Sequence, residues 1–290
     1  IRDTFGWAIG IYEGDDQFNF TPKRGVKVPT FTADKVKDIP AEFVADPFLV
    51  EKNGLWYLFF EAMNMKTFQG DIGVAISKDL NEWIYQKIVL DEPFHLSYPY
   101  VFQWEGEYYM IPEVYQTNSV KLYKAKDFPN HWEYVDTLIY GDQFVDPSVF
   151  YYKNRWWMFV ATTKNDTLYL YSSELLTGPW VEHPQSPVVK NNKRIARPGG
   201  RVIVDGESVI RLTQNDEYHY GNELKAFEIT ELTETTYQEK PWREESLLKS
   251  NGKGWNKNGM HHLDAHRIGA NQWVAAVDGH RNRFLFSLKY

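Results

Sequence analysis

Short apolar segments alternate with polar turns along the whole chain. One of them, ADPFLVEKNGLWYLFFEA from Ala45 to Ala62, has an apolar run, a polar turn and an aromatic run. Runs of this length bounded by Asn, Gly and Asp are typical of β-strands joined by tight hairpins. The 3.6-residue periodicity of amphipathic helices is nearly absent, so the pattern predicts strands with little helix.

The same hairpin recurs along the chain. Related segments begin at Ala45, Ser97, Val145, Arg197 and His261. The first four starts are spaced by about 50 residues, and two further strands follow the hairpin within each unit. Four strands per unit at this period are the signature of a propeller blade. The fifth start is delayed by a polar stretch, 233–258, which we expect to be an exposed insertion.

The repeat predicts an all-β fold, a five-bladed β-propeller that occupies residues 1–290 as a single domain. The expected blades lie near residues 43–90, 94–138, 144–184, 195–230 and 259–290. The last unit has room for about three strands, so an N-terminal strand at residues 5–13 is expected to close the ring. A two-sheet sandwich is the competing interpretation, and it fits the strand content but not the regular four-strand unit.

Composition limits the range of functions. The net charge is -7 and no run of five or more Lys and Arg occurs, which argues against nucleic acid as a partner. No apolar stretch reaches the roughly 18 residues of a membrane span, so no direct span is expected. Without cysteine the chain has no disulfide, thiolate metal site or cysteine nucleophile. The sequence assigns no localisation.

Aromatic residues are unusually frequent, with 11 Trp and 19 Tyr. Their faces can stack on sugar rings while their polar tips form hydrogen bonds, although most of them are expected to fill a large β core.

Ring closure would bring one end of every hairpin to a common channel mouth, because residues equidistant from a hairpin turn lie opposite one another. The pairs expected there are Asp46 with Glu61, Tyr98 with Glu113, Asp146 with Thr162, Arg197 with Gln214, and His261 or His262 with Asp278.

Carboxyl groups at such a mouth favour glycosidic chemistry. One acid must protonate the leaving oxygen while another activates water or attacks the sugar. We expect Asp46 to act as the base, Glu113 as the acid, and Asp146 as the residue that orients and tunes them, with inversion at the sugar. The alternative for Asp46 and Asp146 is a turn-forming role, because Asp before Pro commonly steers the entry of a strand.

The other polar positions of the mouth are expected to contact the substrate: Glu61, Tyr98, Arg197, Arg201, Gln214, His262 and Asp278. The arginines of RPGGR could clamp a carboxylate or phosphate, or could pair with Asp46 or Asp146. The HHLDAH segment could be a metal site or hold a hydrogen-bonded channel histidine, and we assign no metal ligand to it.

The Asp–Pro first strands and the five-fold repeat resemble the propeller glycoside hydrolases of families 43, 32 and 62. In the family 43 pattern this resemblance implies that Asp46 is the base and Asp146 the tuning residue. It also implies a catalytic glutamate near the start of the fourth unit, where this chain has ARPGG instead. No cofactor is implied as required, but relatives often hold an ion such as Ca in the central channel, here near His262.

Several fragments occur in one order along the chain: FVADPFL, WYLFFE, GDIGVA, LDEPFHLSYPYVF, YMIPE, GPW, HHLD and VDG. This set resembles the N-terminal propeller domain of the glucosamine inositolphosphorylceramide transferase family. The glycosyltransferase chemistry of that family belongs to a separate domain. The resemblance therefore implies a saccharide or glycoconjugate ligand and a fused or partner glycosyltransferase domain.

Three functions follow from these observations. The leading hypothesis is a carbohydrate-active enzyme, glycoside hydrolase-like, that cleaves or transfers a glycosyl unit at the channel mouth. The first alternative is a glycan-binding propeller without turnover, accessory to a glycosyltransferase. The second is a structural propeller that uses its faces for protein contacts.

Overall fold

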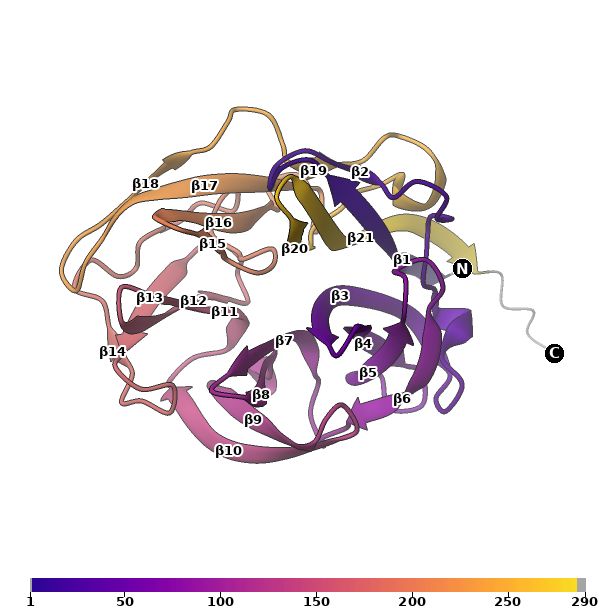
Figure 1. Ribbon diagram of the computed structural model, residues 1–290, viewed down its shortest axis with the longest axis horizontal. Helices are drawn as coiled ribbons and strands as arrows, with labels where there is room; N and C mark the ends of the chain where they lie inside the picture. The colour runs from indigo at the N-terminus through magenta and orange to yellow at the C-terminus, as the bar shows by residue number, and fades with distance from the viewer. Residues whose placement is uncertain (1, 286–290) are drawn as a thin grey trace.

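The structure is a computed structural model that describes residues 2–285, with side chains described from residue 6 to residue 281. Five separate sheets radiate around a common axis, and β3, β7, β11, β15 and β20 face inward (Figure 1). The predicted five-bladed β-propeller is therefore confirmed. Helix is limited to three single 3-10 turns in the described residues, η1 (Ala33–Lys35), η2 (Tyr115–Thr117) and η3 (Gly254–Asn256).

Each blade is an antiparallel sheet whose strands are ordered from the axis to the outer edge. Blade one consists of β3 (Ala41–Lys52), β4 (Leu55–Asn64), β5 (Gln69–Ser77) and β6 (Ile84–Leu90). Blade two consists of β7 (Ser97–Trp104), β8 (Glu107–Glu113), β9 (Ser119–Asp127) and β10 (His131–Tyr140). Blade three consists of β11 (Phe144–Tyr152), β12 (Arg155–Thr162), β13 (Leu168–Ser173) and β14 (Val181–Glu182). Blade four consists of β15 (Ile203–Asp205), β16 (Ser208–Asn215), β17 (Glu223–Leu232), β18 (Tyr237–Pro241) and β19 (Leu248–Lys249).

Blade five joins the two ends of the chain. It is built in the order β20 (Leu263–Gly269), β21 (Gln272–Leu285), β1 (Arg2–Gly14) and β2 (Phe20–Pro22). The expected N-terminal strand at residues 5–13 lies within β1, but each end of the chain contributes two strands rather than three and one. The long β1–β21 ladder closes the ring with main-chain hydrogen bonds.

The stretch 233–258 is not simply an exposed insertion, which corrects the expectation for it. It supplies the outer strands β18 and β19 of blade four. Tyr237, Leu247 and Leu248 from this stretch are buried in the core, so the apolar positions within a polar sequence carry a packing role.

The core consists of five apolar clusters, each lying between two neighbouring blades. Alternate residues of one strand serve different clusters, because successive side chains of a strand point to opposite faces. In β4, Leu58 and Phe60 pack toward blade five, whereas Phe59 packs toward blade two. Both faces of each blade are thus buried, which explains the nearly continuous apolar runs in the sequence.

The inner strands of the first three blades share a kink at their mouth ends. Asp46, Tyr98 and Asp146 all adopt positive φ, at 51, 45 and 50°, and each precedes a proline. A residue other than glycine with positive φ is strained, and the ladder register shifts at each of these three positions.

The shift corrects three expected pairs by one residue or more. Ala45 rather than Asp46 lies opposite Glu61, Ser97 rather than Tyr98 lies opposite Glu113, and Phe144 lies opposite Thr162. In blade four the expected alignment holds, since the Gln214 N–H donates to the Arg197 carbonyl.

Replacing Ile11 with alanine tests ring closure. Ile11 is fully buried in the cluster between blades five and one, so the lost packing should lower the free energy of unfolding by about 2–5 kcal/mol. Denaturant unfolding monitored by tryptophan fluorescence measures this change. The control Thr21→Ala on exposed β2 should change it by less than about 0.5 kcal/mol, and an equally small effect of Ile11→Ala would contradict this packing.

Candidate functional site

Five buried carboxyl groups from four blades meet at the mouth of the channel. They are Asp46 and Glu61 of blade one, Glu113 of blade two, Asp146 of blade three and Asp278 of blade five, and none of them is more than 6% exposed. Their charges are close enough for Asp46, Glu113 and Asp146 all to raise the pKa of Glu61. The sequence-predicted acids therefore do lie together.

A carboxylate from the preceding blade binds the main chain at each kink. The N–H of Asp46 donates to Asp278 at 3.1 Å, the N–H of Tyr98 to Asp46 at 3.3 Å, and the N–H of Asp146 to Glu113 at 3.2 Å. Buried main-chain donors need partners, so these carboxylates join blade to blade. This structural role differs from the turn-forming alternative, in which Asp would bond its own turn.

Arg197 joins two of the acids. Its Nε lies 2.5 Å from Asp146 Oδ2, and its Nη2 lies 3.2 Å from Asp146 Oδ1 and 3.4 Å from Glu113 Oε2. Gln214 donates a further bond of 2.9 Å to Asp146, and Arg197 Nη1 donates to Asn165. Of the two roles open for Arg197, the structure has the ion pair with Asp146, so the guanidinium is already engaged.

His261 lies between two aspartates. Its Nδ1 is 2.9 Å from Asp278 Oδ1, and its Nε2 is 3.1 Å from the Tyr220 hydroxyl and 3.9 Å from Asp46 Oδ1. Trp7 stacks on the imidazole at 4.0 Å. Burial opposes the charged imidazolium, but Asp278 and Asp46 raise the pKa of His261 to about 9.

Glu61 differs from the other acids because its carboxyl group forms no hydrogen bond within the described part of the chain. Its nearest polar partner is His95, whose Nε2 lies 3.7 Å from Glu61 Oε1, beyond hydrogen-bond distance. The His95 Nδ1 accepts the Gly70 N–H, and burial lowers the pKa of His95 to about 4, so that ring is neutral near pH 7. Burial and the neighbouring carboxylates raise the pKa of Glu61 well above its usual value.

Two of the acids, Asp46 and Asp146, have a pKa raised to about 7. Burial raises the pKa of Asp46 to about 7, with Asp146 and Asp278 adding to the rise while His261 and Arg197 oppose it. Burial also raises the pKa of Asp146, against the opposing charge of Arg197. Burial thus raises the pKa of Glu61, Asp46 and Asp146 at one mouth, and carboxyl groups with raised pKa values are typical of acid–base sites.

Two sequence-predicted substrate contacts serve the interior instead. The Tyr98 side chain is fully buried, and its hydroxyl bonds Ser148 Oγ and the Gly200 main chain. Arg201 lies past the mouth, where its Nε is 2.6 Å from Asp264 and its Nη2 donates to the Val101 carbonyl. Arg201 thus adopts an ion pair, but with Asp264 rather than with either aspartate considered from the sequence.

The glycine pair of RPGGR also has a structural reason. Gly200 has φ of +136° and pairs with Leu263 of blade five, and a Cβ at this position would lie 1.9 Å from the Leu263 carbonyl oxygen. Only glycine permits such a close approach of two inner strands.

Three residues offer ligand atoms for a cation: Asp46, His261 and Asp278, all within 4.8 Å of one another. Both ring nitrogens of His261 already have partners, and a charged imidazolium repels a cation. His262 is buried with neither ring nitrogen hydrogen-bonded, and burial lowers the pKa of this ring to about 4. Because Ca²⁺ takes oxygen ligands, the neutral imidazole of His262 does not fit that ion, and we assign none.

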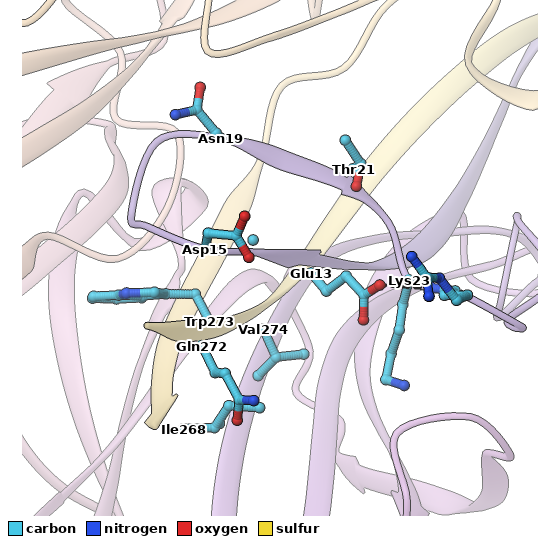
Figure 2. A pocket seen from close by; sticks show the side chains of 11 residues that line it. Glu13, Asp15, Asn19, Thr21, Lys23, Ile268, Gln272, Trp273 and Val274 are labelled. Carbon is cyan, nitrogen blue, oxygen red and sulfur yellow. Dashed lines mark hydrogen bonds between the residues drawn. The ribbon is translucent and has the colours of Figure 1, made fainter. Parts of the chain in front are cut away.

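A surface cavity of about 620 Å³ lies away from these acids (Figure 2). Its walls come from the far end of blade five, where Glu13 and Asp15 face Gln272 and Trp273. Trp273 precedes Asp278 by about 15 Å of strand, so this cavity does not open on the channel mouth.

Four residues of the mouth were not singled out from the sequence: Trp7, Asn165, Asp216 and Tyr220. Tyr220 is the outermost, at 37% exposed, and its ring lies 5.1 Å from the Arg197 guanidinium. Asp216 fixes the Tyr220 loop by accepting bonds from Asn165 and the Gly221 N–H. The polar run NDEYHYG after β16 was the available signal, because a loop rich in Tyr and Asp follows a strand that ends at the mouth.

The fold belongs to the class of five-bladed propellers seen in glycoside hydrolases. The catalytic domain of a family 62 α-L-arabinofuranosidase from Coprinopsis cinerea superposes with a TM-score of 0.63 at 13% identity, over 96% of this chain and 97% of that one. A thermostable family 43 glycoside hydrolase superposes with a TM-score of 0.62 at 14% identity, over 82% and 86%. At such identities the likeness concerns the fold alone.

Residues 2–280 match the family described as glucosamine inositolphosphorylceramide transferase 1, N-terminal, and the chain belongs to this family. A relative from Oryza sativa subsp. japonica named glucosamine inositolphosphorylceramide transferase 1 is 36% identical in an alignment of 300 positions that covers 95% of this chain. The chain spans 40% of the length of that relative. No helix in the described residues is long and apolar enough to cross a membrane.

Two isosteric substitutions should move stability in opposite directions at pH 8. The raised pKa of Asp46 means that its contribution to stability is present at low pH and lost as pH rises through about 7. Asp46→Asn should therefore raise the melting temperature at pH 8 by a few degrees.

Asp264→Asn is the matched variant, because Arg201 and His266 overcome the effect of burial and hold the pKa of Asp264 well below its usual value. That contribution is present at pH 8, so losing the partner of buried Arg201 should cost about 3–5 kcal/mol. Thermal melts of both variants at pH 8 measure the contrast. Equal destabilisation by the two substitutions would contradict the assigned electrostatics.

Proposed function

We propose that the channel mouth processes glycosyl units, cleaving or transferring a sugar by acid–base catalysis. The observation that supports this proposal is that two buried carboxyl groups lie at one mouth, Glu61 with a pKa raised well above its usual value and Asp46 with a pKa raised to about 7. Glycosidic chemistry requires one acid and one base.

In this proposal Asp46 is the base. One of its oxygens, Oδ2, accepts the Tyr98 N–H, while Oδ1 faces His261 and His262 at 3.9 and 3.8 Å and is not hydrogen-bonded in the described residues. Oδ1 takes a proton from water, the water oxygen attacks the anomeric carbon, and the glycosidic oxygen leaves with a proton from an acid. Inversion at the anomeric carbon follows from this route.

Glu61 suits the acid role better than Glu113, to which the sequence led. Glu113 Oε2 accepts from Arg197 and from the Asp146 N–H, so it acts as an acceptor and joins two blades. Glu61 has no such engagement, and its raised pKa keeps a proton available. Asp146 and Arg197 hold the mouth in shape and tune Asp46 by charge, and Tyr220 covers the site on its loop.

A second candidate function is saccharide binding without turnover, next to a fused or partner glycosyltransferase domain. The observation that favours it is the engagement of Arg197, Gln214, Glu113 and Asp146 with one another, a network of the kind that fixes a binding surface. The relatives carry a glycosyltransferase name and are longer than this chain.

Asp46→Asn and Glu61→Gln separate the two functions. Each positioned acid or base contributes about 10²–10⁴ in rate, so either variant should lose turnover by that factor on a panel of aryl glycosides and oligosaccharides while still binding them. Glu113→Gln serves as the matched control with a smaller loss. A wild-type protein that binds saccharides without releasing reducing ends would establish the binding function instead.

The pH dependence should follow the same two groups. Asp46 must be ionised, so kcat/KM should rise as pH increases through about 7, and it should fall only where Glu61 loses its proton. The groups that set this window are His261, Asp146, Asp278 and Arg197 around Asp46. An activity that is already maximal at pH 5 would contradict the base role of Asp46.

A further inference from the structure

A second cavity, lined largely by aromatic side chains, lies between blades two and three on the face of the propeller opposite the channel mouth. Its volume is about 380 Å³. It is lined by Trp104, Glu105, Tyr109, Tyr151, Trp156, Glu174, Leu175, Leu176 and Thr177. We call this cavity the aromatic groove.

Two tight hairpins hold the rings of the aromatic groove in place. The turn after Trp104 has positive φ at Glu105 and Gly106, and the turn after Tyr152 has positive φ at Lys153 and Asn154. Such two-residue turns fit the twist of the strands they join and leave little freedom. Both turns lie at the strand ends remote from Asp46 and Glu113, so this groove is independent of the channel mouth.

Three rings form one wall. Trp104 lies 4.6 Å from Tyr151 and 4.7 Å from Trp156, measured between ring centroids, and Tyr151 and Trp156 are opposite each other in the β11–β12 ladder. Tyr151 is 36% exposed, whereas Trp156 is buried. The wall therefore presents aromatic surface to solvent on a rigid support.

The polar atoms of four of the lining rings form no hydrogen bond within the described residues. Trp132, Trp157 and Trp180 each donate the indole N–H to a main-chain carbonyl. In contrast, no hydrogen bond within the described residues engages the Trp104 or Trp156 indole N–H, or the Tyr109 or Tyr151 hydroxyl. Without an internal partner, these polar atoms can form hydrogen bonds with water or with a ligand.

The charged side chains at the rim of the aromatic groove limit the kind of ligand that can bind there. Glu105 and Glu174 are exposed at the groove, and Glu174 Oε1 lies 3.6 Å from Arg155 Nη2, which leaves Glu105 as the unpaired acid among these three residues. The Glu105 carboxylate disfavours anionic ligands and accepts bonds from hydroxyl groups. Quaternary ammonium ions are usually enclosed by separate ring faces, but here the rings contact one another and form a wall.

We propose that the aromatic groove binds an uncharged pyranose unit of a saccharide, stacked on Tyr151 and Trp104 and hydrogen-bonded by the free ring tips and Glu105. This site is separate from the proposed chemistry at the channel mouth and does not rest on it.

The test is binding of a panel of neutral gluco-, galacto-, manno- and xylo-oligosaccharides, followed by calorimetry and by tryptophan fluorescence. At least one member should bind saturably to the wild-type chain, and Tyr151→Ala and Trp104→Ala should each weaken it at least tenfold. Tyr151→Phe, which keeps the ring, should weaken it less. The control Tyr140→Ala removes a 74% exposed tyrosine elsewhere and should leave affinity unchanged.

Tyr151 is at the surface, so an unchanged melting temperature will establish that Tyr151→Ala is folded. The proposal is overturned if no saccharide of the panel binds, if binding is equal in Tyr151→Ala and the wild type, or if tetramethylammonium binds and saccharides do not. Failure of the channel proposal looks different, because it would appear as missing turnover while the effect of Tyr151→Ala on binding remains.

Discussion

The bond between each kinked inner strand and a carboxylate of the blade before it is the constraint on which the site depends. At Asp46, Tyr98 and Asp146 the chain takes a left-handed conformation before proline, and the ladder register slips. The freed N–H groups would be costly if buried alone, and Asp278, Asp46 and Glu113 bind them in turn. These carboxylates therefore join each of the first three blades to the blade before it.

This arrangement divides the acids by their remaining freedom. Glu113 and Asp146 are held by Arg197, and Asp278 is held by His261. Asp46 keeps one oxygen free, and Glu61 has no hydrogen bond in the described residues. Burial raises the pKa of Asp46, Glu61 and Asp146, and the negative charge that the blade contacts bring together adds to the rise. Residues at a functional site often carry strain and unfavourable charge that the rest of the fold supports.

Much of the fold could be predicted from the sequence, because each blade repeats one hairpin with its own turn residues. The convergence of Asp46, Glu113 and Asp146 also followed from the repeat, since equivalent positions in a ring must meet. The residues that lie opposite one another in the hairpins of the first three blades could not be predicted. The kink before each proline shifts the ladder register, and contacts between carboxylates and the main chain of the next blade hold that kink. The roles of Arg197 and Arg201 depended on which aspartate each one reaches in space, and sequence distance carries no such information.

The remaining residues illustrate a different limit. Tyr220 reaches His261 from a loop that follows β16, and Trp7 reaches the same ring from β1, so their meeting depends on the closed ring. The raised pKa of Glu61 comes from burial and from four carboxylates of four blades, Asp46, Glu113, Asp146 and Asp278, which no local pattern encodes. The chain belongs to the glucosamine inositolphosphorylceramide transferase 1 N-terminal family, which is consistent with the repeat. The chemistry of the mouth depends on the contacts described above.

The proposed chemistry depends on raised pKa values at both Asp46 and Glu61. A carboxyl ¹³C NMR titration of the whole chain, with Asp46→Asn and Glu61→Gln used to assign the two signals, measures this directly. We expect the Asp46 signal to titrate near pH 7 and the Glu61 signal to titrate well above the usual range of a glutamate. Titration of both signals near pH 4, as in exposed acids, would contradict the account.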